Sequence, residues 1–341
     1  MNTAKRNLYI FAFWRHHRGM SGGDNIYEQF TKRKPSNWRV TIFTNTDFFA
    51  KYGYVVDYVM RTYFAIKKAL RIKLLKGDVI YSASDFYPDT FPAFILKWQY
   101  PKNKWVAGFY LFPPPCRLIH WLTQKLSYFL VNGWADVVFV TSVPDQKYFR
   151  HSFVVRGGVE LDVIEQYKKQ YEKQWDAIFI GRLHPQKGIL ELMSMWREVN
   201  KVLPKANLCV VGNGPLLRQA KRLAPSTVDF LGYLEGREKY RMIQSSKIIL
   251  HPAIWDSGGM SCAEGMAYGL PAVGFNLPAY KTYYAEGIVK CNSKAHFAET
   301  IIKLLTDKGL YKIMGEGARS YIYRVWDWDK KAKEIWDILS V

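Results

Sequence analysis

The stretch IFIGRLHPQKGILEL, residues 178–192, decides the fold class of this chain. An apolar run ends at Gly181, a loop with Arg182 and Lys187 follows, and an amphipathic helix is expected from residue 189. A guanidinium can grip two phosphate oxygens, an ammonium adds a point charge, and the first amides of a helix add donors. Loop cations are usually only solvated, but this arrangement directly after a strand favours a diphosphate site in an α/β unit.

The same alternation of strand-length and helix-length segments occurs twice along the chain. Strands are expected at residues 8–14, 40–44, 78–82, 105–109 and 136–141, and again at 177–180, 206–211, 227–231, 248–251 and 271–274. Helices are expected at residues 59–75, 118–131, 189–202, 216–223, 237–245, 261–268 and 328–339. Two βα series predict two doubly wound parallel sheets, joined near residues 153–158. Ligands of such sheets bind beyond the carboxyl ends of the strands, so the cleft between the domains is the expected site.

Length and composition agree with two domains of ordinary size. The chain has 341 residues and is 49% hydrophobic, which is enough for two cores. No apolar run reaches 18 residues, and residues 8–14 are too short for a signal segment, so neither a membrane span nor a leader is expected. The four cysteines lack metal-ligand spacing and favour a reducing, cytoplasmic setting; they are Cys116, Cys209, Cys262 and Cys291.

The net charge of +20 requires a partner and is concentrated in the first half. Residues 1–170 hold 25 Lys and Arg against 12 Asp and Glu. Between residues 51 and 76 only Asp57 opposes seven cations, which are Lys51, Arg61, Lys67, Lys68, Arg71, Lys73 and Lys76. This pattern predicts a helix with one apolar and one basic side, attracted to anionic lipid or polyanions, or simply a solvated face. Zinc-finger and RNA-binding motifs are absent, so nucleic acid ranks low.

A second stretch, WDSGGMSCAEGMAYGLP at residues 255–271, carries two carboxylates. Asp256 precedes a Ser-Gly-Gly turn that permits a close backbone approach to a ligand, and a helix is expected from about Met260. Glu264 lies one turn into that helix, where it can accept bonds from ribose hydroxyls. Asp256 is then expected to face the group attached to the diphosphate. A helix cap and a favourable charge near the helix start are the plain alternatives.

The segment VVGNGPLL, residues 210–217, contains Gly-x-Gly after a strand but lacks the third glycine of the dinucleotide fingerprint. We interpret it as a tight turn beside a ligand, which argues against a NAD-dependent oxidoreductase.

These motifs together resemble the retaining nucleotide-sugar glycosyltransferases of family four, which have the GT-B fold. The family's two acids eight positions apart, with the small-residue helix behind them, match Asp256, Gly259, Glu264, Gly269 and Pro271. Its phosphate loop matches Gly181, Arg182, Lys187 and Gly188. Further similarities are GGVE at residues 157–160, Gly22 and Gly23 in GMSGGDN, and the terminal helix in VWDWDKKAKEIW at residues 325–336.

Three positions depart from the family pattern. The first acid is Asp256 instead of Glu, so it reaches about one methylene less far, and Gly258 replaces the usual aromatic residue. A histidine common in the first domain is absent, and YSASDFYPD offers Ser84 and Asp85 there.

The resemblance implies two facing Rossmann-like domains. Residues 1–156 with 325–341 would bind the acceptor, and residues 157–324 would bind the donor. The implied activity is transfer of a hexose from a nucleotide sugar to a glycan or lipid-linked acceptor, with retention and without a metal or cofactor. The Asp-Trp-Asp at residues 327–329 is expected to cap the last helix and not to hold a metal.

The resemblance also assigns roles to individual residues. The catalytic set is Asp256, Arg182 and Lys187. The donor-binding set is Glu264, Gly258, Gly259, Met260, Gly22, Gly23 and Leu234. The acceptor set is Ser84, Asp85 and His16. Two alternative functions remain: a GT-B nucleotide-sugar epimerase, and a basic protein that binds nucleic acid or another polyanion. For the basic first domain, the hypothesis is a peripheral position at an anionic membrane face.

Overall fold

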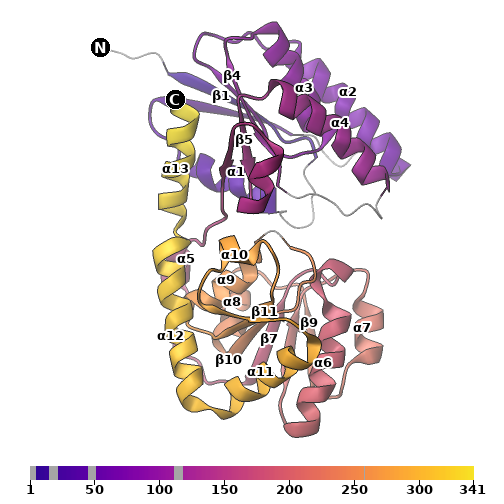
Figure 1. The fold of residues 1–341 in the computed structure, drawn as a ribbon, viewed down its shortest axis with the longest axis vertical. Helices are drawn as coiled ribbons and strands as arrows, with labels where there is room; N and C mark the ends of the chain where they lie inside the picture. Colours follow the sequence, from indigo (N-terminus) through magenta and orange to yellow (C-terminus); the bar gives the residue numbers. More distant parts are fainter. Residues whose placement is uncertain (1–4, 15–21, 45–50, 111–117, 257) are drawn as a thin grey trace. The chain divides into compact units, whose positions relative to one another are not determined.

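The computed structural model describes residues 5–14, 22–44, 51–110, 118–256 and 258–341 (Figure 1). The chain forms two compact units, Met1–Gly157 with Asp329–Val341, and Gly158–Trp328. Each unit contains a six-stranded sheet in which all described neighbours are parallel. The predicted fold class, two doubly wound parallel α/β sheets, is therefore confirmed.

The sheet of the first unit has the order β2-β1-β3-β4-β5-β6. Its strands are β1 (Arg6–Phe11), β2 (Trp38–Phe43), β3 (Val79–Ser82), β4 (Lys104–Gly108), β5 (Val137–Val140) and β6 (Ser152–Val154). In β1, Leu8 lies opposite Val40 of β2 and Val79 of β3. The central strands β3, β4 and β5 are mostly apolar and almost entirely buried, because helices cover both faces of the sheet.

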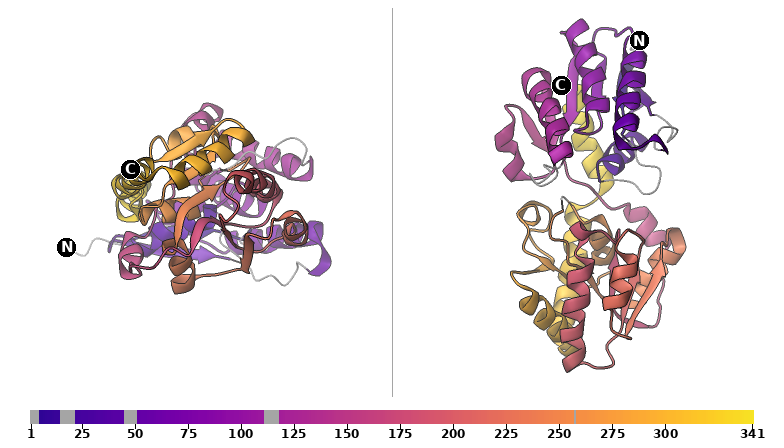
Figure 2. Two further views of the ribbon diagram at one scale, coloured as in Figure 1. Left: turned by 90° about the horizontal axis from the view of Figure 1, so that it is seen from below. Right: turned by 90° about the vertical axis from the view of Figure 1, so that its right-hand side faces the viewer.

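Helices α2 (Tyr54–Ala69), α3 (Tyr87–Gln99) and α4 (Leu118–Trp134) form one layer on this sheet, and α1 (Gly22–Lys32) and α13 (Trp328–Ser340) cover the other face (Figures 1 and 2). Right-handed crossovers cause this division, because the chain moves one way from β1 to β2 and the opposite way from β2 to β5. A 3₁₀ segment, Val143–Tyr148, leads from β5 to the edge strand β6.

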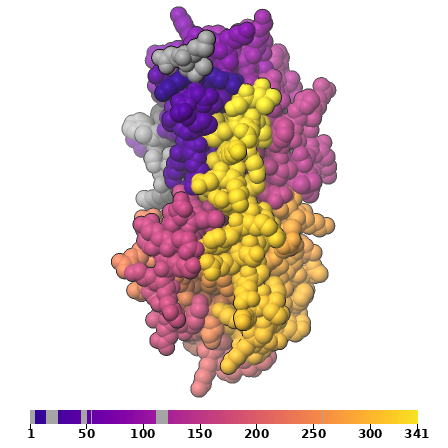
Figure 3. Space-filling view, turned by 90° about the vertical axis from the view of Figure 1, so that its left-hand side faces the viewer, coloured from indigo at the N-terminus to yellow at the C-terminus, as the bar shows by residue number. Residues whose placement is uncertain are grey.

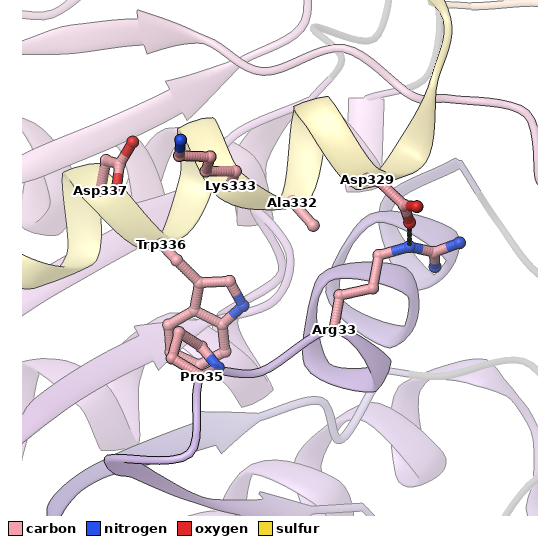
Figure 4. Close-up of a pocket in the computed structure, with 7 residues that line it drawn as sticks. All are labelled: Arg33, Pro35, Asp329, Ala332, Lys333, Trp336 and Asp337. Atoms are coloured by element: carbon pink, nitrogen blue, oxygen red, sulfur yellow. Dashed lines mark hydrogen bonds and ion pairs between the residues drawn. The ribbon is translucent and has the colours of Figure 1, made fainter.

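Helix α13 closes the first unit by packing on α1 and β2 (Figure 3). The Trp336 indole is 3% exposed and donates to the carbonyl oxygen of Phe30 at 2.8 Å. In the first turn of α13, Asp329 accepts from Arg33 at 2.5 Å (Figure 4). Asp329 thus ties the last helix to the end of α1.

The sheet of the second unit has the order β12-β11-β10-β7-β8-β9. Its strands are β7 (Trp175–Ile180), β8 (Leu208–Val211), β9 (Val228–Gly232), β10 (Ser246–His251), β11 (Ala272–Phe275) and β12 (Ile288–Cys291). One core joins this sheet to α6 (Ile189–Val202), α7 (Leu217–Leu223) and α11 (Lys294–Thr306). The core on the other face includes α5 (Leu161–Gln166), α8 (Gly236–Gln244), α9 (Met260–Ala267), α10 (Tyr280–Tyr283) and α12 (Lys308–Val325).

Two chain segments run together where the second unit begins and ends. The Val159 N–H donates to the carbonyl oxygen of Trp326 at 2.6 Å, and Val159 forms a parallel bridge with Asp327. A side chain at Gly158 would lie 2.9 Å from the Trp326 carbonyl and from the Trp328 ring. Gly158, the second glycine of the GGVE segment, therefore permits this close approach.

Two predictions about the basic segment are wrong in detail. Helix α2 covers Tyr54–Ala69 and not residues 59–75, because the chain turns after Leu70 to bring Leu74 into the core. Arg61 does not belong to a basic surface, since it is 3% exposed. Its guanidinium bonds to Asp57 at 2.8 Å and to the Phe13 carbonyl at 2.6 Å.

The helix lengths and the cysteines relate to what was expected from composition. Within the described ranges, no helix is long and apolar enough to cross a membrane. The described cysteines, Cys209, Cys262 and Cys291, are free and buried, and Cys116 lies outside the described residues.

Candidate active site

Strands β7 and β10 define the position of the candidate site in the second unit. They are neighbours in the sheet, with Ile249 opposite Ile178. From β7 the chain crosses through α6 to β8, and from β10 it crosses through α9 to β11 on the opposite side. The strand order thus reverses between β7 and β10, and a crevice for ligands forms at the carboxyl ends of such strands. The two sequence stretches that carry the candidate residues are the loops at these ends.

The loop after β7 is held against the loop after β10. Gly188 has φ of +66°, and a Cβ there would lie 1.9 Å from the Pro252 carbonyl oxygen. This position therefore requires glycine both for its backbone and for its space. The Ile254 N–H also donates to the Gln186 carbonyl at 3.1 Å. The 3₁₀ turn Pro185–Lys187 is thereby fixed beside the residues that follow β10.

Asp256 lies at the centre of a buried charged cluster with Lys187 and His251. Its Oδ2 accepts from Lys187 Nζ at 2.6 Å and lies 2.9 Å from His251 Nε2. The exposed fractions of these side chains are 8% for Asp256, 18% for Lys187 and 4% for His251. The structure therefore brings together two of the predicted catalytic residues and adds a histidine to them.

The electrostatics of this cluster keep Asp256 ionised. Burial opposes ionisation, but the charge of Lys187 and the hydrogen bond from His251 together outweigh it, so the pKa of Asp256 lies well below its usual range. Burial lowers the pKa of His251, although Asp256 acts in the opposite direction. Because an ionised carboxylate can only accept, His251 Nε2 must carry the proton and donate to Asp256.

Helix α9 begins at the same crevice. Its N-cap, Gly259, has φ of +61°, and a Cβ there would lie 2.8 Å from His251 Nε2. Tyr284 donates its hydroxyl proton to the Gly259 carbonyl at 2.7 Å, and Ser261 Oγ donates to the Ile180 carbonyl at 2.7 Å. These bonds place the first turn of α9 at the end of β7. The first amides of a helix lack intrahelical partners and favour an anion.

The remaining candidates of the second unit are distributed around this turn. Glu264, in α9, accepts from Lys239 Nζ of α8 at 2.8 Å, and each side chain is 20% exposed. Arg182, directly after β7, is exposed. Gly258, Met260 and Leu234 are partly buried, and Leu234 precedes α8.

Two of the predicted acceptor residues, Ser84 and Asp85, lie at the corresponding switch point of the first unit, where β1 and β3 are neighbours. Ser84 and Asp85 follow β3, and Gln124 of α4 donates to Asp85 Oδ2 at 2.6 Å. Burial raises the pKa of Asp85 to about 6, although the bond from Gln124 acts against this. Ser84 donates its hydroxyl proton to Asp89, whose other oxygen accepts from the Phe13 N–H at 2.6 Å.

Three other candidates belong to the first unit. Gly22 and Gly23 form the beginning of α1. His16 lies outside the described residues.

Sequence reasoning missed His251 and Lys239. His251 is the last residue of a buried strand, and its only signal was its place at the carboxyl end of β10. Lys239 lies in the polar helix α8, twenty-five residues from its partner Glu264. His251 and its partner Asp256 are five residues apart in one strand and its following loop, whereas only the packing of α8 against α9 brings Lys239 to Glu264.

No group of three or more His, Cys, Asp or Glu side chains arranged to hold a metal ion occurs in the portion of the chain that the structure describes.

Comparison with known proteins shows which sequences this chain is similar to. Residues 162–321 match the family of glycosyl transferases group 1. An uncharacterized glycosyltransferase of Methanocaldococcus jannaschii is 26% identical over 75% of this chain and 73% of its own length. A GDP-mannose-dependent monoacylated alpha-(1-6)-phosphatidylinositol monomannoside mannosyltransferase of Corynebacterium glutamicum is 27% identical over 47% of this chain, and the match spans only 45% of that relative.

Solved structures share the fold over nearly the whole chain. The Anabaena protein HepE, solved in complex with UDP and glucose, has a TM-score of 0.73 at 15% identity, covering 98% of this chain and 99% of that one. Sucrose-phosphate synthase from Thermosynechococcus elongatus has a TM-score of 0.77 at 14% identity, covering 98% of both chains.

Proposed function

Because this chain is a group 1 glycosyltransferase with the GT-B fold, we propose that it transfers a hexose from a nucleoside-diphosphate sugar to a glycan or lipid-linked acceptor, with retention of the anomeric configuration and without a metal. One observation carries the proposal. The loops at the carboxyl ends of β7 and β10 carry two cationic side chains, Arg182 and Lys187, and the ionised Asp256, and α9 begins at the same edge. That combination suits a diphosphate leaving group.

The chemistry assigned to the site is stabilisation of the leaving diphosphate. Lys187 and Arg182 would neutralise the charge that develops as the bond to the sugar breaks, and the amides at Gly259 and Met260 would add donors. Removal of one such preorganised donor typically raises the barrier by roughly 3–4 kcal/mol. The 2.6 Å bond to Asp256 fixes the position of the Lys187 ammonium. We further assign Asp256 to the donor sugar hydroxyls.

Glu264 is assigned to the ribose of the donor. One of its oxygens already accepts from Lys239 at 2.8 Å, which holds the carboxylate in place for hydrogen bonds from hydroxyls. Two donor nucleotides should be tested first, UDP and GDP, because HepE was solved with UDP and the Corynebacterium relative is GDP-mannose-dependent.

The acceptor is assigned to the first unit, at Ser84 and Asp85. A lipid-linked acceptor is supported by the Corynebacterium relative and by the phosphatidyl-myo-inositol mannosyltransferase of Mycobacterium leprae, 28% identical over 47% of this chain and 44% of that protein. We include His16 in this assignment because it follows β1 in the sequence.

Binding of nucleotides tests the donor site directly. Thermal shifts would be measured with UDP, GDP, ADP and their sugar conjugates on the wild type, Glu264→Ala and Arg182→Ala. Arg222→Ala is a matched control, because Arg222 is exposed at the end of α7, away from the carboxyl edge of the sheet. A ligand at one hundred times its Kd adds about 2.7 kcal/mol of stability.

The expected result is a clear upward shift with one nucleotide in the wild type and the control, and a much smaller shift in both site variants. No shift with any nucleotide would refute the donor site.

The reaction itself needs separate assays. Proton NMR of the product should show the anomeric configuration of the donor, and a chelator should leave the rate unchanged. Release of an epimerised nucleotide or free sugar without any need for an acceptor would favour the epimerase instead.

A further inference from the structure

Helices α2 and α4 of the first unit expose rows of apolar side chains. On α2, Val55, Val59 and Tyr63 follow one another at intervals of four residues and are 63%, 58% and 54% exposed. On α4, Leu122, Leu126 and Phe129 are 49%, 58% and 69% exposed. These spacings place each row on one face of its helix. An isolated exposed leucine needs no explanation, but two ordered rows do.

The two rows belong to one side of the unit. Helix α3 lies between α2 and α4 in a single layer on the sheet (Figure 1), and Trp98 near its end is 65% exposed. The inner sides of the three helices fill the core with residues such as Ala65, Leu96 and Val131. Their outer sides therefore form one continuous surface, which we call the α2–α4 surface.

The charge of the α2–α4 surface has one sign. Residues 51–134 contain twelve Lys and Arg, four Asp and no Glu. None of the four aspartates is exposed: Asp57, Asp78 and Asp89 are buried, and Asp85 is partly buried against Gln124. By contrast, the cations of these helices that are exposed are Lys67, Lys68 and Lys125, and Arg71, Lys73 and Lys76 are exposed in the adjoining segment between α2 and β3.

The cations lie beside the apolar rows. Lys67 continues the row of Val55, Val59 and Tyr63 by one further helical turn, and Lys125 lies between Leu122 and Phe129 at helical spacing. Basic and apolar side chains on one face, with acidic groups turned inward, match a bilayer whose headgroups are anionic and whose interior is apolar.

We propose that the α2–α4 surface docks on the face of an anionic lipid bilayer. Apolar side chains of α2 and α4 enter the boundary between headgroups and acyl chains, and the lysines contact lipid phosphates. A second copy of the chain fits less well, because two surfaces of the same positive sign repel. Nucleic acid fits less well too, because most side chains of the two rows are aliphatic (Val55, Val59, Leu122 and Leu126), and these neither stack on bases nor pair with phosphates.

The docked surface adjoins the assigned acceptor residues within the same unit. Gln124, which is 7% exposed, donates to Asp85 from the inner side of α4, between the outward-facing Leu122 and Leu126. Docking would therefore bring the loop after β3 to the lipid. The docking proposal itself does not depend on the glycosyltransferase activity.

Vesicle flotation of the full chain tests the proposal. The vesicles are phosphatidylcholine alone and phosphatidylcholine with phosphatidylglycerol. One variant pair is Leu126→Ser with Phe129→Ser, and the other is Lys67→Gln with Lys68→Gln. The control carries Ile313→Ser and Lys201→Gln, which alter a 68% exposed isoleucine and an exposed lysine of the second unit.

The wild type and control should float with anionic vesicles and bind neutral vesicles at least tenfold more weakly. Loss of the two large apolar side chains should weaken binding by roughly tenfold or more. Loss of each lysine should weaken it by about fivefold at low salt, and the lysine effect should vanish at high salt.

Three outcomes would overturn the proposal. The first is equal binding to neutral and anionic vesicles, and the second is wild-type binding by both variant pairs. The third is binding of RNA, or self-association sensitive to the apolar variants, in the absence of flotation. The melting temperature of each variant is measured as a control for folding. If it is unchanged, and any nucleotide-induced shift seen in the wild type is also unchanged, then weaker flotation reports a loss of docking and not a loss of folding.

Discussion

The buried pair of Asp256 and Lys187 allows a quantitative prediction about the second unit. Asp256→Asn keeps the shape of the side chain but removes the charge that neutralises Lys187 at 2.6 Å. Removing one partner of a buried pair destabilises a protein by roughly 3–5 kcal/mol. Since 18% of the Lys187 side chain is exposed and can reach water, we expect the lower end, about 3 kcal/mol. For a unit of this size that corresponds to a fall of roughly 6–12 °C in melting temperature.

A double-mutant cycle isolates the pair from the rest of the site. Asp256→Asn, Lys187→Met and the double variant would be compared by denaturant unfolding at pH 7. The double variant should recover most of the loss, because it leaves no unpaired buried charge, and the coupling energy should exceed about 1.5 kcal/mol. The exposed pair Glu198–Lys201, at 2.7 Å and with 56% and 70% of the side chains exposed, is the control. Its coupling should stay below about 0.5 kcal/mol.

The pH dependence gives the sign of the same effect. The folded-state pKa of Asp256 is lowered, so its contribution to stability is fully present above the ordinary aspartate pKa of about 4 and is lost as the pH falls further. The stability difference between wild type and Asp256→Asn should therefore shrink on acidification below pH ~4. Additive single variants, or a difference that grows in acid, would refute the reasoning.

Three other changes have defined outcomes. Gly259→Ala should lower the free energy of unfolding by about 1–3 kcal/mol and reduce donor-induced thermal shifts. The reason is that Gly259 has φ of +61° and that an added Cβ would lie 2.8 Å from His251 Nε2. An unchanged melting curve would contradict this. Asp85 has a pKa raised to about 6, so the stability of the first unit should fall as the pH rises from 4 to 6, and Asp85→Asn should abolish that slope in urea titrations. Trp336→Phe should destabilise the first unit by about 1–3 kcal/mol in chemical denaturation, because it removes the 2.8 Å bond to the Phe30 carbonyl, whereas a loss confined to the second unit would be inconsistent with the packing of α13.

Local sequence patterns were sufficient for most of the architecture. Helix α6 was predicted with its observed bounds, Ile189–Val202, because one side of it is apolar at helical spacing and Gly188 precedes it. The strand centres were predictable because strands covered on both faces are continuously apolar. The edge strands β6 (Ser152–Val154) and β12 (Ile288–Cys291) were missed, because each is short and only partly buried.

The loops of the candidate site were also predictable, since glycine and charged residues directly after a strand mark the edge where ligands bind. This local pattern is enough to place Arg182, Lys187 and Asp256 on loops at that edge. Their pairing was not predictable. Sequence reasoning assigned Lys187 to a diphosphate and Asp256 to a sugar, whereas the structure joins the two side chains and adds His251.

Charge patterns show the clearest division between sequence and tertiary structure. The excess of cations in residues 51–134 is a property of the sequence alone. The sequence alone does not determine which of these cations faces inward, because Arg61 and Lys67 lie in the same amphipathic pattern. Arg61 is buried because the fold supplies Asp57 and the Phe13 carbonyl to satisfy its guanidinium. The sequence determined the elements and the chemistry available at their ends, and tertiary contacts between distant segments decided which charges pair and which remain at the surface.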